Sequence, residues 1–147
     1  MKRSLMVFLF LVFAYTANAC GQSATSTPAA GSRPVEDQAG LLSALQAAGA
    51  TIETGDSITQ EFFSVEGQIV KVNGADLQVF EYENAEAREK DASQVAADGG
   101  SIGTSMVTWI DAPHFYKAGR IIVLYVGNDQ TLLDLLNKVM GHQFAGQ

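Results

Sequence analysis

The stretch GQIVKVNGADLQVFEY, residues 67–82, carries the clearest local signal in the chain. Asn73-Gly74 lies between two runs of alternating apolar residues, and this dipeptide favours a type I′ turn because both residues tolerate a positive φ. A two-residue loop sets Lys71 opposite Asp76 as a cross-strand ion pair on one face. The same register puts four apolar side chains together on the other face: Val70, Val72, Leu77 and Val79. The stretch therefore predicts an antiparallel hairpin with one buried face.

Two further strands are expected downstream of this hairpin. RIIVLYV, residues 120–126, is apolar on both faces, which is typical of a central strand covered on both sides. MVTWI, residues 106–110, has the apolar and β-branched composition of a strand and is expected to complete a second hairpin. A short strand is also expected at 50–53.

Three helices are expected around these strands. The first covers 36–48 and stops at Gly49, and the second covers 84–97 with Asn84 as its N-cap. The third begins after Asn128 and ends at Gly141, with a buried apolar stripe at Leu132, Leu135, Leu136, Val139 and Met140. The resulting order is α-ββ-α-ββ-α, which predicts an α+β fold with a mainly antiparallel sheet, built from two hairpins, and helices packed on it.

The N-terminus has the pattern of an export signal. Lys2 and Arg3 precede an unbroken apolar run, LMVFLFLVFA, which is shorter than the roughly 20 residues that a membrane-spanning helix needs. The run is followed by Ala17-Asn18-Ala19, whose small alanines suit a peptidase, and then by Cys20. Residues 1–19 are therefore expected to be a signal peptide, and the protein is expected to be exported to the cell envelope.

Cys20 is the one cysteine of the chain, so it has no partner for an intramolecular disulfide. One interpretation is that Cys20 becomes a lipidated N-terminus, since a thiolate is the natural acceptor for a diacylglyceryl group. Two or three acyl chains, such as palmitate, would anchor the protein firmly in a membrane. The alternative is cleavage after Ala19 by an ordinary signal peptidase, which would leave a free thiol on a secreted soluble protein.

The remaining sequence divides into a tether and one domain. Residues 20–34 contain the lipidated Cys and a small, polar, proline-containing stretch that cannot build a core, whereas 35–147 has the size of a single domain. The part after Cys20 contains 16 acidic and 7 basic residues, a net charge of −9. This charge argues against binding to nucleic acid or to anionic lipid surfaces, and the sequence has no motif for a cofactor.

Ser101, Asp111 and His114 are the candidates for catalytic chemistry. GGSIG, residues 99–103, matches the G-x-S-x-G pattern around Ser101, and Asp111 and His114 would complete a catalytic triad. A nucleophile elbow, however, needs a strand before the serine and a helix after it, and the expected order here is the reverse. Asp111 and His114 also supply too few ligands for a metal site. The sequence therefore favours no catalytic, cofactor-binding or metal-binding residues.

An aromatic cluster is the other candidate site. Trp109, His114, Phe115 and Tyr116 lie beside an expected turn. If these side chains point outward they form a contact patch, since aromatic side chains offer large area at low entropic cost. If they alternate along a strand, half of them belong to the core instead, and the sequence favours this second interpretation.

Residues FFSVEGQIVKVNG (62–74) and PHFYKAGRIIVLYVG (113–127) resemble those of a group of small, uncharacterised bacterial lipoproteins. The resemblance covers most of 36–146 and implies a signal peptide, a lipobox-like Cys, a polar tether and one α+β domain. Ala17 stands where the lipobox usually has leucine. The resemblance implies no activity.

These observations lead to an envelope-tethered lipoprotein with a non-enzymatic binding or accessory domain, held at the membrane through Cys20. The alternatives are a small extracytoplasmic hydrolase that uses Ser101 and His114, and a purely structural surface protein.

Overall fold

A six-stranded antiparallel sheet is the centre of the computed structural model, which describes residues 34–147. The order of the strands across the sheet is β1-β2-β3-β7-β6-β8, and a separate two-stranded sheet contains β4 and β5. The elements along the chain are α1 (Gln38–Ala47), β1 (Ile52–Ile58), β2 (Gly67–Val72), β3 (Ala75–Glu81), α2 (Ala85–Ala92), β4 (Ser101–Ile102), β5 (Ser105–Met106), β6 (Pro113–Ala118), β7 (Ile121–Val126), α3 (Gln130–Met140) and β8 (Ala145–Gly146). The fold is therefore α+β, as the sequence predicted.

The hairpin at Asn73-Gly74 has the predicted register. Lys71 pairs with Asp76 across β2 and β3, and their side chains form an ion pair at 2.6 Å. Asn73 and Gly74 both have positive φ, as the turn requires. The four predicted apolar side chains are all buried in one cluster: Val70, Val72, Leu77 and Val79.

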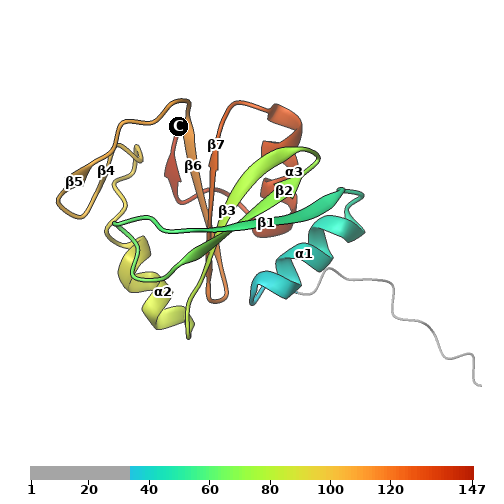
Figure 1. The fold of residues 1–147 in the computed structure, drawn as a ribbon, viewed down its shortest axis with the longest axis horizontal. Helices are drawn as coiled ribbons and strands as arrows, with labels where there is room; N and C mark the ends of the chain where they lie inside the picture. The colour runs from blue at the N-terminus through green and yellow to red at the C-terminus, as the bar shows by residue number, and fades with distance from the viewer. Residues whose placement is uncertain (1–33) are drawn as a thin grey trace, which may run out of the picture.

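Strand β7 is central and covered on both faces, as its sequence predicted. Ile121 and Val123 belong to the apolar cluster under α1 and α3, whereas Ile122 and Leu124 belong to a second cluster on the opposite face. Figure 1 shows α1 and α3 on one side of the sheet, and α2 with the β4–β5 pair on the other. Within the described residues, the second face is covered by one short helix, so loops cover much of it.

The second hairpin uses a different strand from the predicted one. The pairing partner of β7 is Pro113–Ala118, joined to it through a tight turn at Gly119-Arg120, and not 106–110. The prediction of a strand at 106–110 was wrong, because only Ser105–Met106 pairs, and it does so with β4. Pro113 is tolerated because it is the first residue of its strand.

Several predicted boundaries also shift. The N-cap of α3 is Asp129, whose side chain accepts hydrogen bonds from Thr131 and Leu132, and not Asn128. Helix α2 begins after Asn84 as predicted but ends at Ala92 instead of 97, because Val95 forms a bridge with Ile102. Strand β1 runs to Ile58, further than the predicted 50–53.

The start of the domain is fixed against the turn between β6 and β7. The backbone N–H of Arg120 donates to the carbonyl of Glu36 at 2.9 Å, and the Arg120 side chain forms an ion pair with Glu81. The Arg88 guanidinium donates to the Gly119 carbonyl from Nε and Nη2, at 3.2 and 3.0 Å. The signal peptide and Cys20 lie outside the described residues, and no helix among residues 34–147 is long and apolar enough to cross a membrane.

Gly119→Ala is expected to destabilise the fold strongly. Gly119 has φ +45°, and a Cβ there would lie 2.3 Å from the backbone of Glu36. Left-handed strain and the clash together predict a loss of about 3 kcal/mol in the free energy of unfolding, measured by urea denaturation. Gly49→Ala is the matched control, because Gly49 has φ +94° with nothing near its Cβ position. The free energy of unfolding of Gly49→Ala should fall by only about 1 kcal/mol. Equal losses in the two variants would contradict the close packing of the Glu36 backbone against this turn.

Candidate functional site

His114 is a structural residue in β6. Its side chain is 4% exposed, its Nε2 lies 3.0 Å from the Gly127 carbonyl oxygen, and its Nδ1 lies 2.7 Å from the side-chain amide of Gln143. The ring also stacks on Tyr125, with centroids 5.9 Å apart. Both ring nitrogens are therefore occupied in joining β6 to the loop after β7 and to the C-terminal segment.

The three residues considered for a catalytic triad do not lie together in the structure. The Asp111 carboxylate accepts from the backbone N–H of Ala112 and from the Asn128 side chain, and neither Asp111 nor Ser101 hydrogen-bonds to His114. Ser101 begins β4, so GGSIG leads into a strand and lacks the helix that a nucleophile elbow requires. Within residues 34–147, no group of three or more His, Cys, Asp or Glu side chains is placed to hold a metal ion.

The predicted aromatic contact patch is mostly core. Phe115 and Tyr116 are 0% and 1% exposed, His114 is buried, and Trp109 is half-buried. Tyr116 belongs to the apolar cluster under α1 and α3, and Phe115 belongs to the cluster on the opposite face, so β6 is covered on both faces. The alternative of a core position is therefore what the structure shows for the three strand residues.

The exposed apolar side chains lie a few residues earlier. Met106 is 91% exposed and Ile110 is 99% exposed, and both belong to the segment between β4 and β6. Sequence reasoning missed them because the composition of MVTWI predicts a strand of the main sheet, where apolar side chains are covered. Met106 instead lies in the two-residue β5, whose residues are both exposed, and Ile110 follows the end of that strand.

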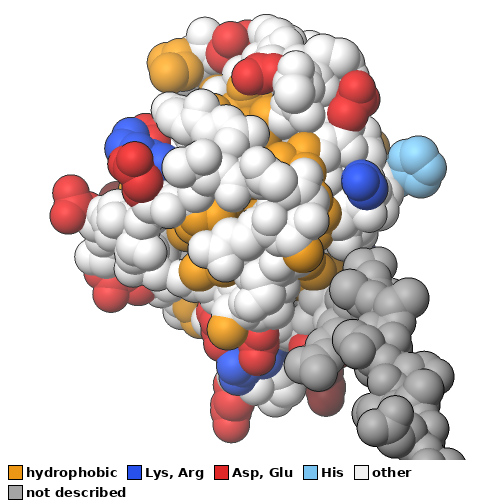
Figure 2. All heavy atoms as spheres, turned by 90° about the vertical axis from the view of Figure 1, so that its right-hand side faces the viewer, with side chains coloured by type: hydrophobic (Ala, Val, Ile, Leu, Met, Phe, Trp, Pro, Cys, Tyr) orange, Lys and Arg blue, Asp and Glu red, His pale blue; other side chains and the backbone are white. Residues whose placement is uncertain are grey.

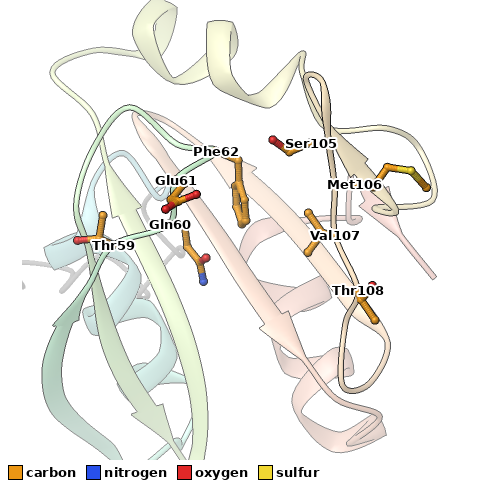
Figure 3. Close-up of a pocket in the computed structure, with 8 residues that line it drawn as sticks. All are labelled: Thr59, Gln60, Glu61, Phe62, Ser105, Met106, Val107 and Thr108. Atoms are coloured by element: carbon orange, nitrogen blue, oxygen red, sulfur yellow. The ribbon is translucent and has the colours of Figure 1, made fainter.

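A groove lies between the loop after β1 and the segment after β4, with Met106 among its lining residues and Ile110 two positions after the lining residue Thr108. It has a volume of about 340 Å³ and is lined by Thr59, Gln60, Glu61, Phe62, Ser105, Met106, Val107 and Thr108. Figure 3 shows Phe62 and Val107 in the space between the two segments, whereas Met106 extends away from it. Five of the eight lining residues are exposed, so the groove is shallow and open.

Aromatic side chains join the two walls beneath the groove. Phe62 packs edge-on against Trp109, with ring centroids 6.2 Å apart, and Trp109 packs in the same way on Phe115 at 5.8 Å. The indole N–H of Trp109 donates to the Gly99 carbonyl at 2.7 Å. Edge-to-face aromatic pairs of this kind each contribute about 0.5–1.5 kcal/mol beyond their burial. The groove therefore rests on the apolar cluster that covers the second face of the sheet.

Hydrogen bonds fix the wall formed by residues 59–66. The Gln60 amide donates to Gln78 in β3 at 2.8 Å. The backbone N–H and the hydroxyl of Ser64 both donate to Oδ2 of Asp91 at 2.7 Å, and Asp91 is 4% exposed. A buried carboxylate at the end of α2 thus holds the loop in place.

Tyr82 is the other buried polar group near this wall. Its hydroxyl is buried and has no hydrogen-bond partner among residues 34–147. Burial, followed by the neighbouring Asp91 carboxylate, raises the pKa of Tyr82 well above its ordinary value. Burial also raises the pKa of Tyr116, with a smaller contribution from Asp134.

A second apolar surface lies on the opposite side of the molecule. Leu42 of α1 and Leu135, Val139 and Met140 of α3 are half-buried against the core. Figure 2 shows hydrophobic patches on this side, with charged side chains mainly around the margin. These side chains fill the junction between packed elements and are less exposed than Met106 and Ile110.

No protein-family model matches the sequence, and no curated protein or solved structure matches it. Inference about function therefore depends on the arrangement of the chain's own residues. Among these, the groove and the two exposed apolar side chains beside it form the best candidate site.

The raised pKa values of the two tyrosines predict a loss of stability at alkaline pH. An unfolded tyrosine titrates near pH 10, and the folded state prefers the protonated phenol. The free energy of unfolding contributed by Tyr82 is thus fully present below pH 10 and falls as the pH rises above it. Between pH 9 and 11 the loss from Tyr82 is about 1.4 kcal/mol, and Tyr116 adds to it in the same direction.

Tyr82→Phe isolates this effect. At pH 7 the variant should have nearly unchanged stability, since the hydroxyl has no partner among the described residues. Between pH 9 and 11, the free energy of unfolding, measured by urea denaturation, should fall less in the variant than in the wild type. The difference between the two falls is the contribution of Tyr82. An identical alkaline loss in both proteins would contradict the burial of this hydroxyl.

Proposed function

We propose that this protein is an exported, lipid-anchored, non-enzymatic binding domain of the cell envelope, and that its contact surface is the groove together with Met106 and Ile110. The exposure of these two side chains is the observation that carries the proposal. Single exposed apolar residues are common on protein surfaces. Here two large ones lie within five residues of each other in the segment that forms one wall of the groove, and the groove has Phe62 and Val107 among its lining residues.

The energetics favour a contact surface at this position. Burial of a Met or Ile side chain contributes about 1.5–3 kcal/mol, and aromatic or aliphatic anchors dominate most protein interfaces. The aromatic pairs below the groove hold its walls in place, which reduces the entropy lost on binding. The absence of an assembled triad among the described residues leaves the hydrolase alternative without support from His114.

The position of the groove suits a protein held by its N-terminus. The chain enters the domain at Glu36, beside the turn at Gly119-Arg120. In Figure 1 the β4–β5 pair lies on the other side of the sheet from α1. A tether that ends at residue 34 would therefore leave the groove accessible to a partner.

Lipidation at Cys20 is expected to decide where the protein is found. Mass spectrometry of the mature protein should show an N-terminal Cys20 that carries a diacylglyceryl group, in the membrane fraction. Cys20→Ser should move the protein out of that fraction, because its acyl chains are lost. An unmodified thiol, or an intact signal peptide in the cytosolic fraction, would contradict the anchoring.

A photo-crosslinking residue placed at Ile110 should capture a partner in intact cells. We expect one discrete adduct, which disappears when Met106→Ser is added, because both side chains contribute to the same contact. The matched control is the same crosslinker at Ala47, an exposed position on α1. No adduct from position 110, or the same adduct from position 47, would contradict the proposed surface.

A further inference from the structure

We infer that the partner at this groove is a positively charged polypeptide segment, in which Lys or Arg side chains alternate with apolar ones. The inference deepens the proposed function and rests on it. It is carried by charge complementarity around the groove, by the exposed apolar side chains and by the open shape of the groove.

The residues that line the groove, 59–62 and 105–108, carry one carboxylate, Glu61, and no basic residue, and the longer stretches around them are acidic up to Lys71, Lys90 and Lys117. Residues 51–70 contain four Asp or Glu and no Lys or Arg, and residues 91–116 contain three and none. Glu61 lines the groove, is exposed, and has no ion-pair partner among the described residues. A cationic side chain lying in the groove would therefore meet an unpaired carboxylate.

The basic residues of the domain are mostly engaged elsewhere. Residues 34–147 contain 16 acidic and six basic residues, a net charge of −10. Four of the six basic residues form ion pairs: Lys71 with Asp76, Arg88 and Lys117 with Glu89, and Arg120 with Glu81. The field of the domain as a whole is thus negative and attracts a cationic partner, which raises the rate of association.

The shape of the groove favours an extended polypeptide. Drug-sized ligands usually bind in enclosed pockets that cover most of their surface, and this groove is lined mainly by exposed residues. Thr59, Ser105 and Thr108 place hydroxyl groups along its walls, where they suit the N–H and C=O groups of a peptide backbone. Met106 at the groove and Ile110 four residues later are exposed and offer apolar contacts. A second copy of this chain, or an anionic membrane, would be repelled by the negative charge.

The test uses three peptides and the intact protein, extracted in an uncharged detergent. The peptides are acetylated and amidated GKLGKLGKLG, GQLGQLGQLG and GELGELGELG, so that only the charged position differs. Trp109 is the one tryptophan of the chain and packs on Phe62 beneath the groove, so its fluorescence reports binding. We expect the lysine peptide to bind most tightly, with a Kd that rises about fivefold between 25 and 300 mM NaCl.

Two charge variants localise the attraction. Glu61→Gln should weaken binding of the lysine peptide about threefold, the range of an exposed ion pair. Glu86→Gln is the matched control, because Glu86 is an exposed carboxylate on α2, outside the groove, and it should leave the Kd unchanged. Equal effects of the two variants would show a diffuse attraction to the acidic protein and would overturn the inference.

The remaining outcomes separate the inference from the proposed function. If the glutamine peptide binds as tightly as the lysine peptide, and Met106→Ser weakens both, the groove is a binding surface but the inferred charge of the partner is wrong. If Met106→Ser and Ile110→Ser leave every titration unchanged, both the inference and the proposed surface are wrong. A shift in Trp109 fluorescence on adding uncharged phosphatidylcholine vesicles, with none on adding peptide, would identify a lipid contact and overturn the inference.

Discussion

The burial of β7 on both faces is the constraint on which the rest of the structure depends. Ile121 and Val123 pack towards α1 and α3, and Ile122 and Leu124 pack towards the other side. A strand of this kind is stable only if two separate layers cover the sheet. Residues 34–147 provide two helices for the first face, but only the eight-residue α2 for the second. Loops must therefore complete the second layer.

This requirement explains why the loops of the second face are built like core segments. Phe63 of the loop after β1 packs on Phe80 of the sheet, with centroids 4.7 Å apart, and Trp109 packs on Phe115. The Asp91 carboxylate accepts two hydrogen bonds from Ser64 and so holds the same loop in place. Side chains that the layer does not need for packing, Met106 and Ile110, face solvent, and Met106 lines the groove. The candidate site is thus a consequence of how the sheet is covered.

The parts of the fold that local chemistry decides could be predicted from sequence. Asn73-Gly74 specifies its own turn, and the apolar run 121–126 identifies a central strand wherever its partners lie. The hairpin partner of β7 depends on the turn at Gly119-Arg120, whose signal is weaker than Asn-Gly, so the composition of 106–110 predicts a strand there and misses the one at 113–118. The groove could not be predicted, because it joins residues 59–62 to 105–108 through tertiary packing alone.

Unfolding followed by two probes tests most directly whether the loop layer is part of the core. Trp109, the one tryptophan, reports on the loops, and far-UV circular dichroism reports on the sheet and helices. We predict that the two urea transitions coincide in midpoint and slope, because the loops and the sheet share one apolar cluster. A fluorescence transition at clearly lower urea would mean that the loops melt separately from the sheet, and it would contradict a groove built on the covered face.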